Sequence, residues 1–272
     1  MSTSPFRTNE ISNPAFESDH LRFITVKTPN LRGRGDICVF VPPLDGLRDV
    51  PLVILLHGVY GSAWSWSQQA GAHRTAWTMI QNGKIPPMVV AMPSDGLWGD
   101  GSGYVPHDGY DFEKWIVEDV PQAVIKNISA VGGGSQCFIA GLSMGGFGAL
   151  RLGLKYRDKF RAISAHSAIT DLDQMPMFVE ESLENYKQAD EKQRSVWGMV
   201  EDDTRNLPAI RFDCGTEDEL LPHNRILHEQ FSNADIDHIY KEFRGGHEWS
   251  YWGEHLKDTL CFFAEASKND HR

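Results

Sequence analysis

Five short, nearly continuous apolar runs constrain the fold of this chain more than any other feature of its sequence. They are PLVILLHG (51–58), PMVVAMP (87–93), SQCFIAG (135–141), FRAISAHS (160–167) and PAIRFDCG (208–215). Runs of this length are typical of parallel strands buried on both faces of a sheet. Helix-like segments alternate with them, around residues 66–80, 111–128, 145–156, 222–233 and 248–266. This alternation predicts an α/β protein with a doubly wound sheet and right-handed crossovers.

Three further runs complete the predicted sheet. LRFITVKT (21–28) and GDICVFVP (35–42) flank PNLRGR and predict an antiparallel hairpin, and DHIYKEF (237–243) predicts a last strand. We therefore expect about eight strands, the first two or three antiparallel and the rest parallel. A chain of 272 residues fits one α/β domain, and we predict a single domain over residues 1–272.

Two segments interrupt the alternation of strands and helices. Residues 94–110 (SDGLWGDGSGYVPHDGY) are rich in Gly and Asp and predict a loop. Residues 168–207 are charged and partly helix-like, and they predict an insertion before the strand at 208–215. Long segments of this kind often form a lid or a wall of a binding site.

Composition narrows the classes of partner. The formal net charge of −11 argues against nucleic acids and anionic membranes, because both need a basic surface. The first residues (MSTSPFRTNE) lack the pattern of a secretion signal, and no run has the roughly 18 apolar residues of a membrane span. We expect a cytoplasmic protein with buried, reduced cysteines, and the sequence leaves open whether it forms a homo-oligomer.

Ser143 lies in a G-x-S-x-G motif, GLSMG (141–145), between an apolar run and a helix-like segment. A serine in this place either caps the helix or acts as a nucleophile. At a strand-to-helix turn the motif raises a nucleophilic hydroxyl above the sheet, and its glycines allow neighbouring backbone to come close. The N-terminus of the next helix also favours negative charge. We therefore predict that Ser143 is a nucleophile.

A serine nucleophile of this kind needs an acid and a base, in the chain order Ser, Asp or Glu, His. His247 is the histidine that follows the carboxyl end of the last predicted strand, where two glycines let the chain turn. The acid is expected in or beside the loop GTEDELLP (215–222). Spacing favours Asp218 there and leaves three other carboxylates open, namely Asp213, Glu217 and Glu219.

An oxyanion hole needs two backbone N–H donors. One is expected on Met144, the residue after the nucleophile. The other is expected in the turn after the strand at 51–58, where Val59 follows His57 and Gly58. We expect His57 itself to be structural.

Four motifs together resemble the Putative esterase family of α/β-hydrolases. In chain order they are LLHGVYGSAWSW (55–66), GLSMGGFGAL (141–150), FDCGTEDELL (212–221) and GGHEWSYW (245–252). The family includes S-formylglutathione hydrolases, tributyrin-type carboxylesterases, feruloyl and acetylxylan esterases and mycolyltransferases. The resemblance extends over about residues 20–265 and implies an α/β-hydrolase fold. The functional residues that it implies are Ser143 as nucleophile, Asp218 as acid, His247 as base, and Val59 and Met144 as oxyanion donors.

The motifs and the resemblance predict a serine carboxylesterase. We expect it to hydrolyse a small-molecule ester, with a short acyl group or a carbohydrate-linked one, through an acyl-enzyme and without a metal or cofactor. The alternatives are an S-formylglutathione-type thioesterase or an acyltransferase with the same triad. S-formylglutathione hydrolases usually carry a cysteine near the oxyanion hole, where this chain has GVYGSAW (58–64).

Tryptophans and aspartates near the predicted site suggest further contacts. Trp64, Trp66 and Trp98 follow strand ends, and we expect them to contact substrate. Trp249 and Trp252 have helical spacing and are expected in the core. The aspartates of the Gly-rich segment do not have the spacing of an EF-hand loop, so a solvated loop is expected rather than a calcium site; they are Asp95, Asp100, Asp108 and Asp111.

Overall fold

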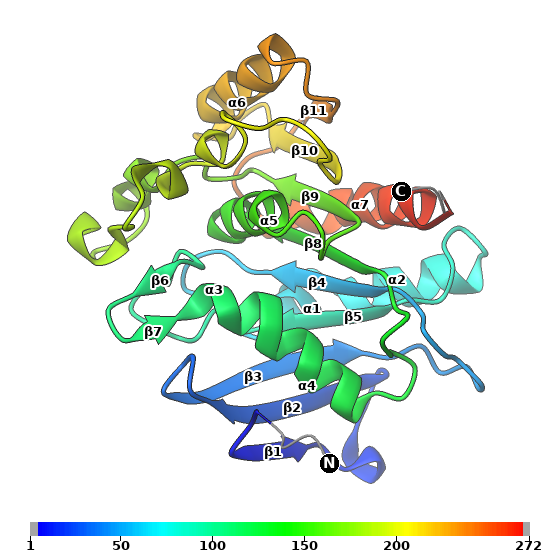
Figure 1. Cartoon of the computed structure of the whole chain (residues 1–272). Coiled ribbons are helices and arrows are strands. Elements are labelled where there is room, and N and C mark those ends of the chain that lie inside the picture. The colour runs from blue at the N-terminus through cyan, green and yellow to red at the C-terminus, as the bar shows by residue number, and fades with distance from the viewer. Residues whose placement is uncertain (1–4, 269–272) are drawn as a thin grey trace.

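A nine-stranded sheet forms the centre of the molecule in the computed structural model, which describes residues 5–268 (Figure 1). The strand order is β1-β2-β3-β5-β4-β8-β9-β10-β11. The first four strands in this order pair antiparallel, and all others pair parallel. The strands are β1 (Thr8–Ile11), β2 (Leu21–Thr28), β3 (Gly33–Phe40), β4 (Leu52–Leu56), β5 (Val89–Pro93), β8 (Cys137–Leu142), β9 (Ala162–His166), β10 (Ala209–Gly215) and β11 (Ile239–Phe243).

Each of the eight predicted runs forms a strand of this sheet, and β1 is an additional one. Its sequence, TNEI, lies at the sheet edge and is mostly exposed, so it carries no apolar pattern. The predicted loop at 94–110 also contains structure, because a short hairpin pairs β6 (Pro106–His107) with β7 (Tyr110–Asp111). That residues 1–272 form one domain stays a prediction.

Helices cover both faces of the sheet and explain why its central strands are continuously apolar. Along β4, Val53 and Leu55 pack in the core under α1, α2 and α7, whereas Ile54 and Leu56 pack in the core on the opposite face. The helices are α1 (Ser65–Gln69), α2 (Ala72–Gln81), α3 (Phe112–Lys114), α4 (Val120–Asn127), α5 (Met144–Lys155), α6 (Leu221–Asn233) and α7 (Trp249–Lys268).

Two predicted helices are interrupted. The segment at 66–80 divides into α1 and α2 at Gly71, whose φ of 61° lies outside the helical region. The segment at 111–128 contains a π-helical stretch at Trp115–Asp119, between α3 and α4. Pro121 lies two residues after the end of this stretch and has no N–H for an α-helical hydrogen bond, which is a local reason for the widened turn.

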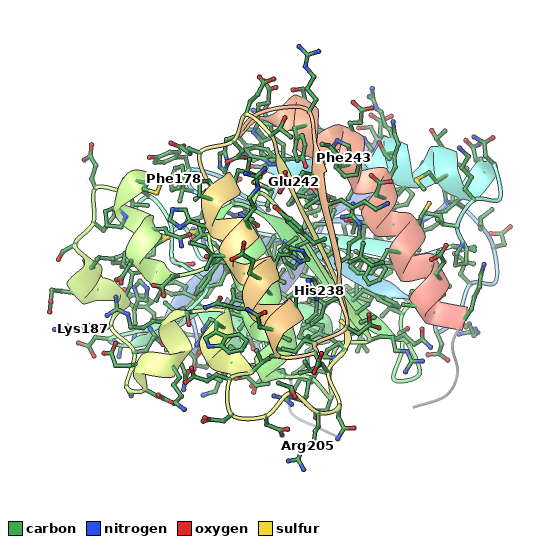
Figure 2. All side chains as sticks on the ribbon, turned by 90° about the horizontal axis from the view of Figure 1, so that it is seen from above. Phe178, Lys187, Arg205, His238, Glu242 and Phe243 are labelled. Atoms are coloured by element: carbon green, nitrogen blue, oxygen red, sulfur yellow. The ribbon has the colours of Figure 1, made fainter. Side chains whose placement is uncertain are left out.

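The insertion at 168–207 consists of short 3₁₀ helices rather than α-helices. They are η3 (Leu172–Met177), η4 (Leu183–Tyr186), η5 (Glu191–Arg194) and η6 (Trp197–Met199). In the view of Figure 2, the part of the insertion that carries Phe178 and Lys187 lies on the side of α6 away from α7.

A buried ionic cluster attaches the insertion to α5. The Arg151 side chain is fully buried and donates from Nε to the carbonyl oxygen of Gln193, at 2.8 Å. Its guanidinium also donates to Glu113 Oε2 at 2.6 Å, and Lys155 Nζ donates to both Glu113 and Gln193. Moving the insertion away from α5 would take hydrogen-bond acceptors from the buried Arg151 guanidinium, which is costly. The cluster therefore fixes the insertion against the helix that begins at Met144.

Candidate active site

Ser143 occupies a sharp turn between β8 and α5. Its backbone has φ 53° and ψ −121°, a conformation that L-residues rarely adopt and that costs on the order of 1–3 kcal/mol. The Ser143 N–H donates to the carbonyl oxygen of His166 at 3.0 Å, which ties the turn to the neighbouring strand β9. Within the described chain, the Ser143 hydroxyl makes no capping bond to α5, so the structure does not support the helix-cap alternative.

The two glycines of the motif are required by close packing of the backbone. A Cβ at Gly141 would stand 2.1 Å from the carbonyl oxygen of Gly145. A Cβ at Gly145 would stand 2.4 Å from the carbonyl oxygen of Leu56 in β4. Real Cβ atoms do not come this close to backbone oxygens, so only glycine fits at either position.

The structure brings Ser143, His247 and Asp218 together from three separate loops. His247 Nε2 lies 3.0 Å from Ser143 Oγ. His247 Nδ1 lies 3.1 Å from Asp218 Oδ1 and 3.0 Å from Asp218 Oδ2. This continuous chain of hydrogen bonds is the geometry expected of nucleophile, base and acid.

The other carboxylates that the sequence left open do not reach His247 in this structure. Asp213 is buried within β10 and binds His166 instead. The Glu217 carboxylate faces Arg244 at 3.7 Å, and Glu219 is exposed.

The residues around the Asp218–His247 pair keep Asp218 ionised and hold the His247 ring in place. Burial by itself raises the pKa of Asp218, but hydrogen bonds from His247 and from the Leu220 N–H outweigh it and leave this pKa below its ordinary value. The Phe178 ring stacks on the His247 imidazole at 5.3 Å between centroids, and the edge of Trp252 meets it at 4.9 Å. Trp252 was predicted only as a core residue, and it is 5% exposed.

The oxyanion donors predicted on Val59 and Met144 belong to the two segments that meet at Ser143, and their role stays a prediction. Met144 is the first residue of α5. The turn after β4 passes against the nucleophile, because a Cβ on Gly58 would stand 3.2 Å from Ser143 Cβ. His57 is 2% exposed, and its ring contacts the backbone of Gly58 at 2.6 Å and of Asp95 at 3.1 Å. These contacts agree with a structural role for His57.

Comparison with known proteins identifies the family. A sequence model of the family described as Putative esterase matches residues 29–263. The chain belongs to this family. An acetyl esterase from Caldicellulosiruptor saccharolyticus is 29% identical over 240 residues, which span 81% of this chain and 85% of that protein.

Solved structures show the same fold. The similar structures include an S-formylglutathione hydrolase from Agrobacterium tumefaciens, with a TM-score of 0.78 and 20% identity over 97% of this chain and 99% of that one. A ferulic acid esterase has a TM-score of 0.74 and 22% identity over 96% of this chain and 99% of its own. The predicted α/β-hydrolase fold and the predicted class, a carboxylic-ester hydrolase, are confirmed.

Of the three tryptophans expected at the substrate site, the esterase exposes Trp64 most. It is 48% exposed in the turn before α1. The expectation for Trp66 is wrong, because its side chain is 1% exposed and its Nε1–H donates to the carbonyl oxygen of Leu56. Trp98 is partly buried and packs against other aromatic rings, with His107 at 4.3 Å and Tyr186 at 5.9 Å.

Three of the four aspartates considered for a calcium site, Asp95, Asp100 and Asp111, bind protein groups. Asp95 accepts hydrogen bonds from the N–H groups of Leu97 and Ser102, and Asp111 accepts one from the Lys114 N–H. Between residues 5 and 268, no cluster of three His, Cys, Asp or Glu side chains is suited to a metal ion.

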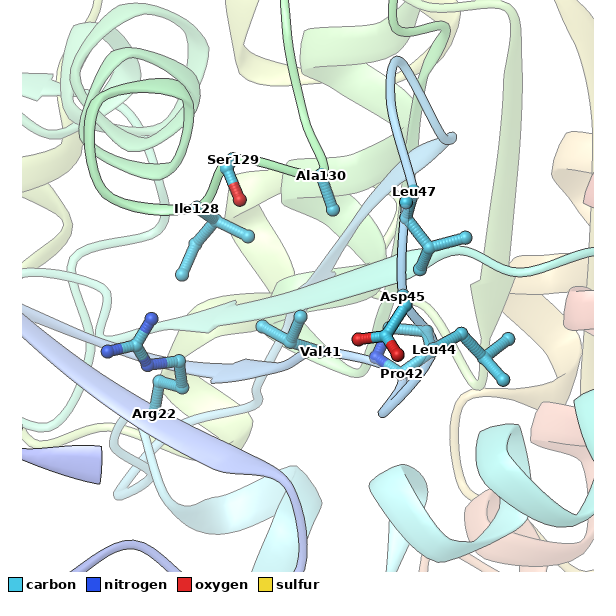
Figure 3. Close-up of a pocket in the computed structure, with 10 residues that line it drawn as sticks. Arg22, Val41, Pro42, Leu44, Asp45, Leu47, Ile128, Ser129 and Ala130 are labelled. Atoms are coloured by element: carbon cyan, nitrogen blue, oxygen red, sulfur yellow. The ribbon is translucent and has the colours of Figure 1, made fainter. Parts of the chain in front are cut away.

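A surface cavity of about 240 Å³ lies away from the Ser143 turn (Figure 3). Its lining includes Arg22, Val41 and Ile128, and Val41 follows the end of β3, which runs antiparallel to the central strands. The cavity therefore lies near the amino ends of the central strands, at the opposite end of the sheet from their carboxyl ends.

In the described part of the chain, no helix has the length and apolarity to cross a membrane.

A second buried His–Asp pair of the esterase lies under the Ser143 turn and was not predicted as a pair. His166 Nδ1 lies 3.0 Å from both carboxylate oxygens of Asp213, and both side chains are fully buried. Arg211 and the Tyr251 hydroxyl also donate to Asp213. The signal in the sequence was an arginine and an aspartate inside the apolar run PAIRFDCG, where buried charges need partners.

Replacing Asp213 with asparagine is expected to lower the free energy of unfolding near neutral pH by about 3–5 kcal/mol, because Arg211 and His166 stay buried without a carboxylate. Burial raises the pKa of Asp213, but His166, Arg211 and Tyr251 together lower it to about 2. The unfolded chain, with an ordinary pKa of 3.8, then binds more protons in this range. The stabilisation is present above pH 3.8 and is lost as the pH falls toward about 2.

Urea unfolding of the wild type and Asp213→Asn between about pH 5 and pH 3 checks this expectation. The wild type should lose stability with falling pH more steeply than the variant. Asp108→Asn, at an exposed aspartate, should follow the wild type. Parallel curves for wild type and Asp213→Asn would contradict the assignment.

Proposed function

We propose that this esterase is a serine carboxylesterase that hydrolyses small esters with short acyl groups, including carbohydrate-linked ones, through an acyl-enzyme. The proposal rests on the hydrogen-bonded chain from Ser143 Oγ through His247 to Asp218. The similar acetyl esterase supports the short acyl group. A small-molecule ester is the partner that this function requires, and the expected cytoplasmic location stays a prediction.

Each side chain of the triad has a role in the proposed acylation. His247 Nε2 removes the proton of Ser143 as Oγ attacks the ester carbonyl carbon, and the carbonyl oxygen becomes an oxyanion. Asp218 accepts the Nδ1–H bond, which fixes the tautomer of His247 and stabilises the imidazolium that forms. The backbone amides of Val59 and Met144 hold the oxyanion. His247 then protonates the leaving alcohol, and the acyl group remains on Ser143.

Deacylation repeats these steps with water as the nucleophile. His247 removes a proton from water, the hydroxide oxygen attacks the acyl carbon, and a second oxyanion forms between the same two amides. Collapse of this intermediate releases the carboxylic acid and returns the proton to Ser143 Oγ. Besides the ester and water, these steps use only groups of the protein's own residues.

A panel of esters tests the proposal: p-nitrophenyl acetate, butyrate and octanoate, methyl ferulate and acetylated xylan, with Ser143→Ala as control. We expect turnover of the acetate and butyrate that disappears in the variant. S-formylglutathione is assayed beside these esters. If it is hydrolysed faster than every oxygen ester, the thioesterase alternative replaces the proposal. No turnover of any ester above the Ser143→Ala background would overturn it.

A further inference from the structure

The Gly-rich loop after β5 packs against the side chains of both proposed oxyanion residues, Val59 and Met144. A Cβ on Gly101 would stand 2.4 Å from Met144 Sδ and 3.2 Å from Val59 Cγ1. The Gly103 N–H also points at Met144 Sδ, at 3.4 Å. The side chains of Val59 and Met144 thus converge on a buried stretch of this loop, where a residue larger than glycine would displace the end of the Met144 side chain.

Asp100, in the same loop, joins three segments of the site. Its carbonyl oxygen accepts a hydrogen bond from the Tyr60 N–H at 2.8 Å, and Tyr60 directly follows Val59. Its carboxylate Oδ2 accepts one from the Glu180 N–H at 3.0 Å, in the insertion. Its own N–H donates to Glu181 Oε1 at 2.9 Å. One residue therefore connects the turn after β4, the Gly-rich loop and the insertion.

Tyr60 needs this support because its backbone is strained. Its φ is 60°, in the left-handed region that bulky residues rarely occupy, and its side chain is 70% exposed. Such a conformation persists only where surrounding contacts fix it. Tyr60 is held at its N–H by Asp100 and at its hydroxyl by the carbonyl oxygen of Phe178, whose ring stacks on His247. The strained residue is thus fixed between the Val59 amide and the base.

We propose that Asp100 and Gly101 are positioning residues of the oxyanion hole. The Asp100 carbonyl oxygen holds the N–H of the Val59–Tyr60 peptide. The bond from the Glu180 N–H to the Asp100 carboxylate keeps that carbonyl in place, so loss of the carboxylate loosens the turn that carries the Val59 amide. Gly101 lets Val59 and Met144 pack close enough for their amides to face one oxygen atom. This inference rests on the proposed function and adds the element that aligns its two donors.

The variants Asp100→Ala, Asp100→Asn and Gly101→Ala test the inference, with Asp108→Ala as control. Asp108 lies in the same loop and is exposed, and no hydrogen bond or ion pair of its side chain is seen among the described residues. Because small misplacements of catalytic groups are costly, kcat on p-nitrophenyl butyrate should fall about 10–100-fold in Asp100→Ala and Gly101→Ala. KM should change by less than about threefold. Asparagine keeps an acceptor for the Glu180 N–H, so Asp100→Asn should stay within about threefold of the wild type.

Inhibition by a short trifluoromethyl ketone separates a positioning role from a structural one. Ser143 Oγ adds to the ketone carbon, and the former carbonyl oxygen becomes an oxyanion in the hole. The inhibition constant should therefore weaken by the same factor as kcat/KM, since both report binding of the oxyanion. Melting temperatures identify any variant that fails to fold; if Asp100→Ala does so, Gly101→Ala and Asp100→Asn carry the test.

Several outcomes would overturn the inference. In one, kcat stays within about threefold of the wild type in both Asp100→Ala and Gly101→Ala. In another, kcat/KM falls while ketone inhibition is unchanged. In a third, Asp108→Ala loses as much activity as Asp100→Ala. Each result, seen with an active wild type and inactive Ser143→Ala, would leave the proposed function intact, whereas a wild type that neither hydrolyses esters nor binds the ketone would overturn both.

Discussion

Replacing Ser143 with alanine is expected to lower kcat on p-nitrophenyl butyrate by about 10⁶-fold, the loss found when a serine hydrolase of this mechanism loses its nucleophile. Without Oγ no acyl-enzyme forms, and only oxyanion binding and substrate orientation remain to accelerate attack by water. Hydrolysis rates at saturating substrate, with enough variant to measure a slow rate, give the number.

Folding of this variant is checked by its melting temperature, which should stay close to that of the wild type. Alanine keeps the Cβ and the backbone bond from position 143 to the His166 carbonyl, so only the hydroxyl is lost. A variant that kept more than about 1% of wild-type activity would show that another group is the nucleophile.

The second large effect is expected for Asp218→Asn, with a fall in kcat of about 10⁴-fold, as in triads whose acid becomes an amide. The asparagine NH₂ group can donate to His247 Nδ1 and so favour the tautomer that carries its proton on Nε2. That tautomer cannot accept the Ser143 proton. The kcat of the variant on the same ester measures the loss.

Glu219→Gln is the matched control for this loop, because Glu219 is exposed and lies beside Asp218 in the sequence. Its activity should equal that of the wild type. The opposite result, an active Asp218→Asn and an impaired Glu219→Gln, would move the acid to Glu219.

The apolar runs predicted the sheet well because strands buried on both faces must be apolar throughout. Edge strands have no such requirement, and β1, with the sequence TNEI, gave no signal. The breaks at Gly71 and before Pro121 depend on single residues within otherwise helical patterns.

The candidate site was predictable where a local motif determines the geometry. The turn at Ser143 requires glycine on both sides, and the two glycines before His247 were visible in the same way. Trp66 shows the limit: only one residue separates it from Trp64, but it lies within helix α1 and its side chain is buried in the core. Position along the chain alone could not show which tryptophan a substrate can reach.

Contacts between distant segments were beyond the reach of the sequence. His166 and Asp213 are 47 residues apart, and Asp100 and Glu180 are 80 apart. Neither pair belongs to a motif of fixed spacing, because each depends on which strands and loops the fold places side by side.

The attachment of the insertion to α5 limits how the specificity of this esterase can be redesigned. Residues 168–207 form a continuous insertion, which suggests exchanging it for the corresponding segment of a related esterase. However, Arg151 and Lys155 reach into it at Gln193, and Glu113 balances their charge from α3. A transplanted segment without a matching acceptor would leave the buried guanidinium of Arg151 short of a hydrogen bond, on the same helix that follows Ser143. A chimera should therefore take from the related esterase both the insertion and the residues at the positions that correspond to 113, 151 and 155.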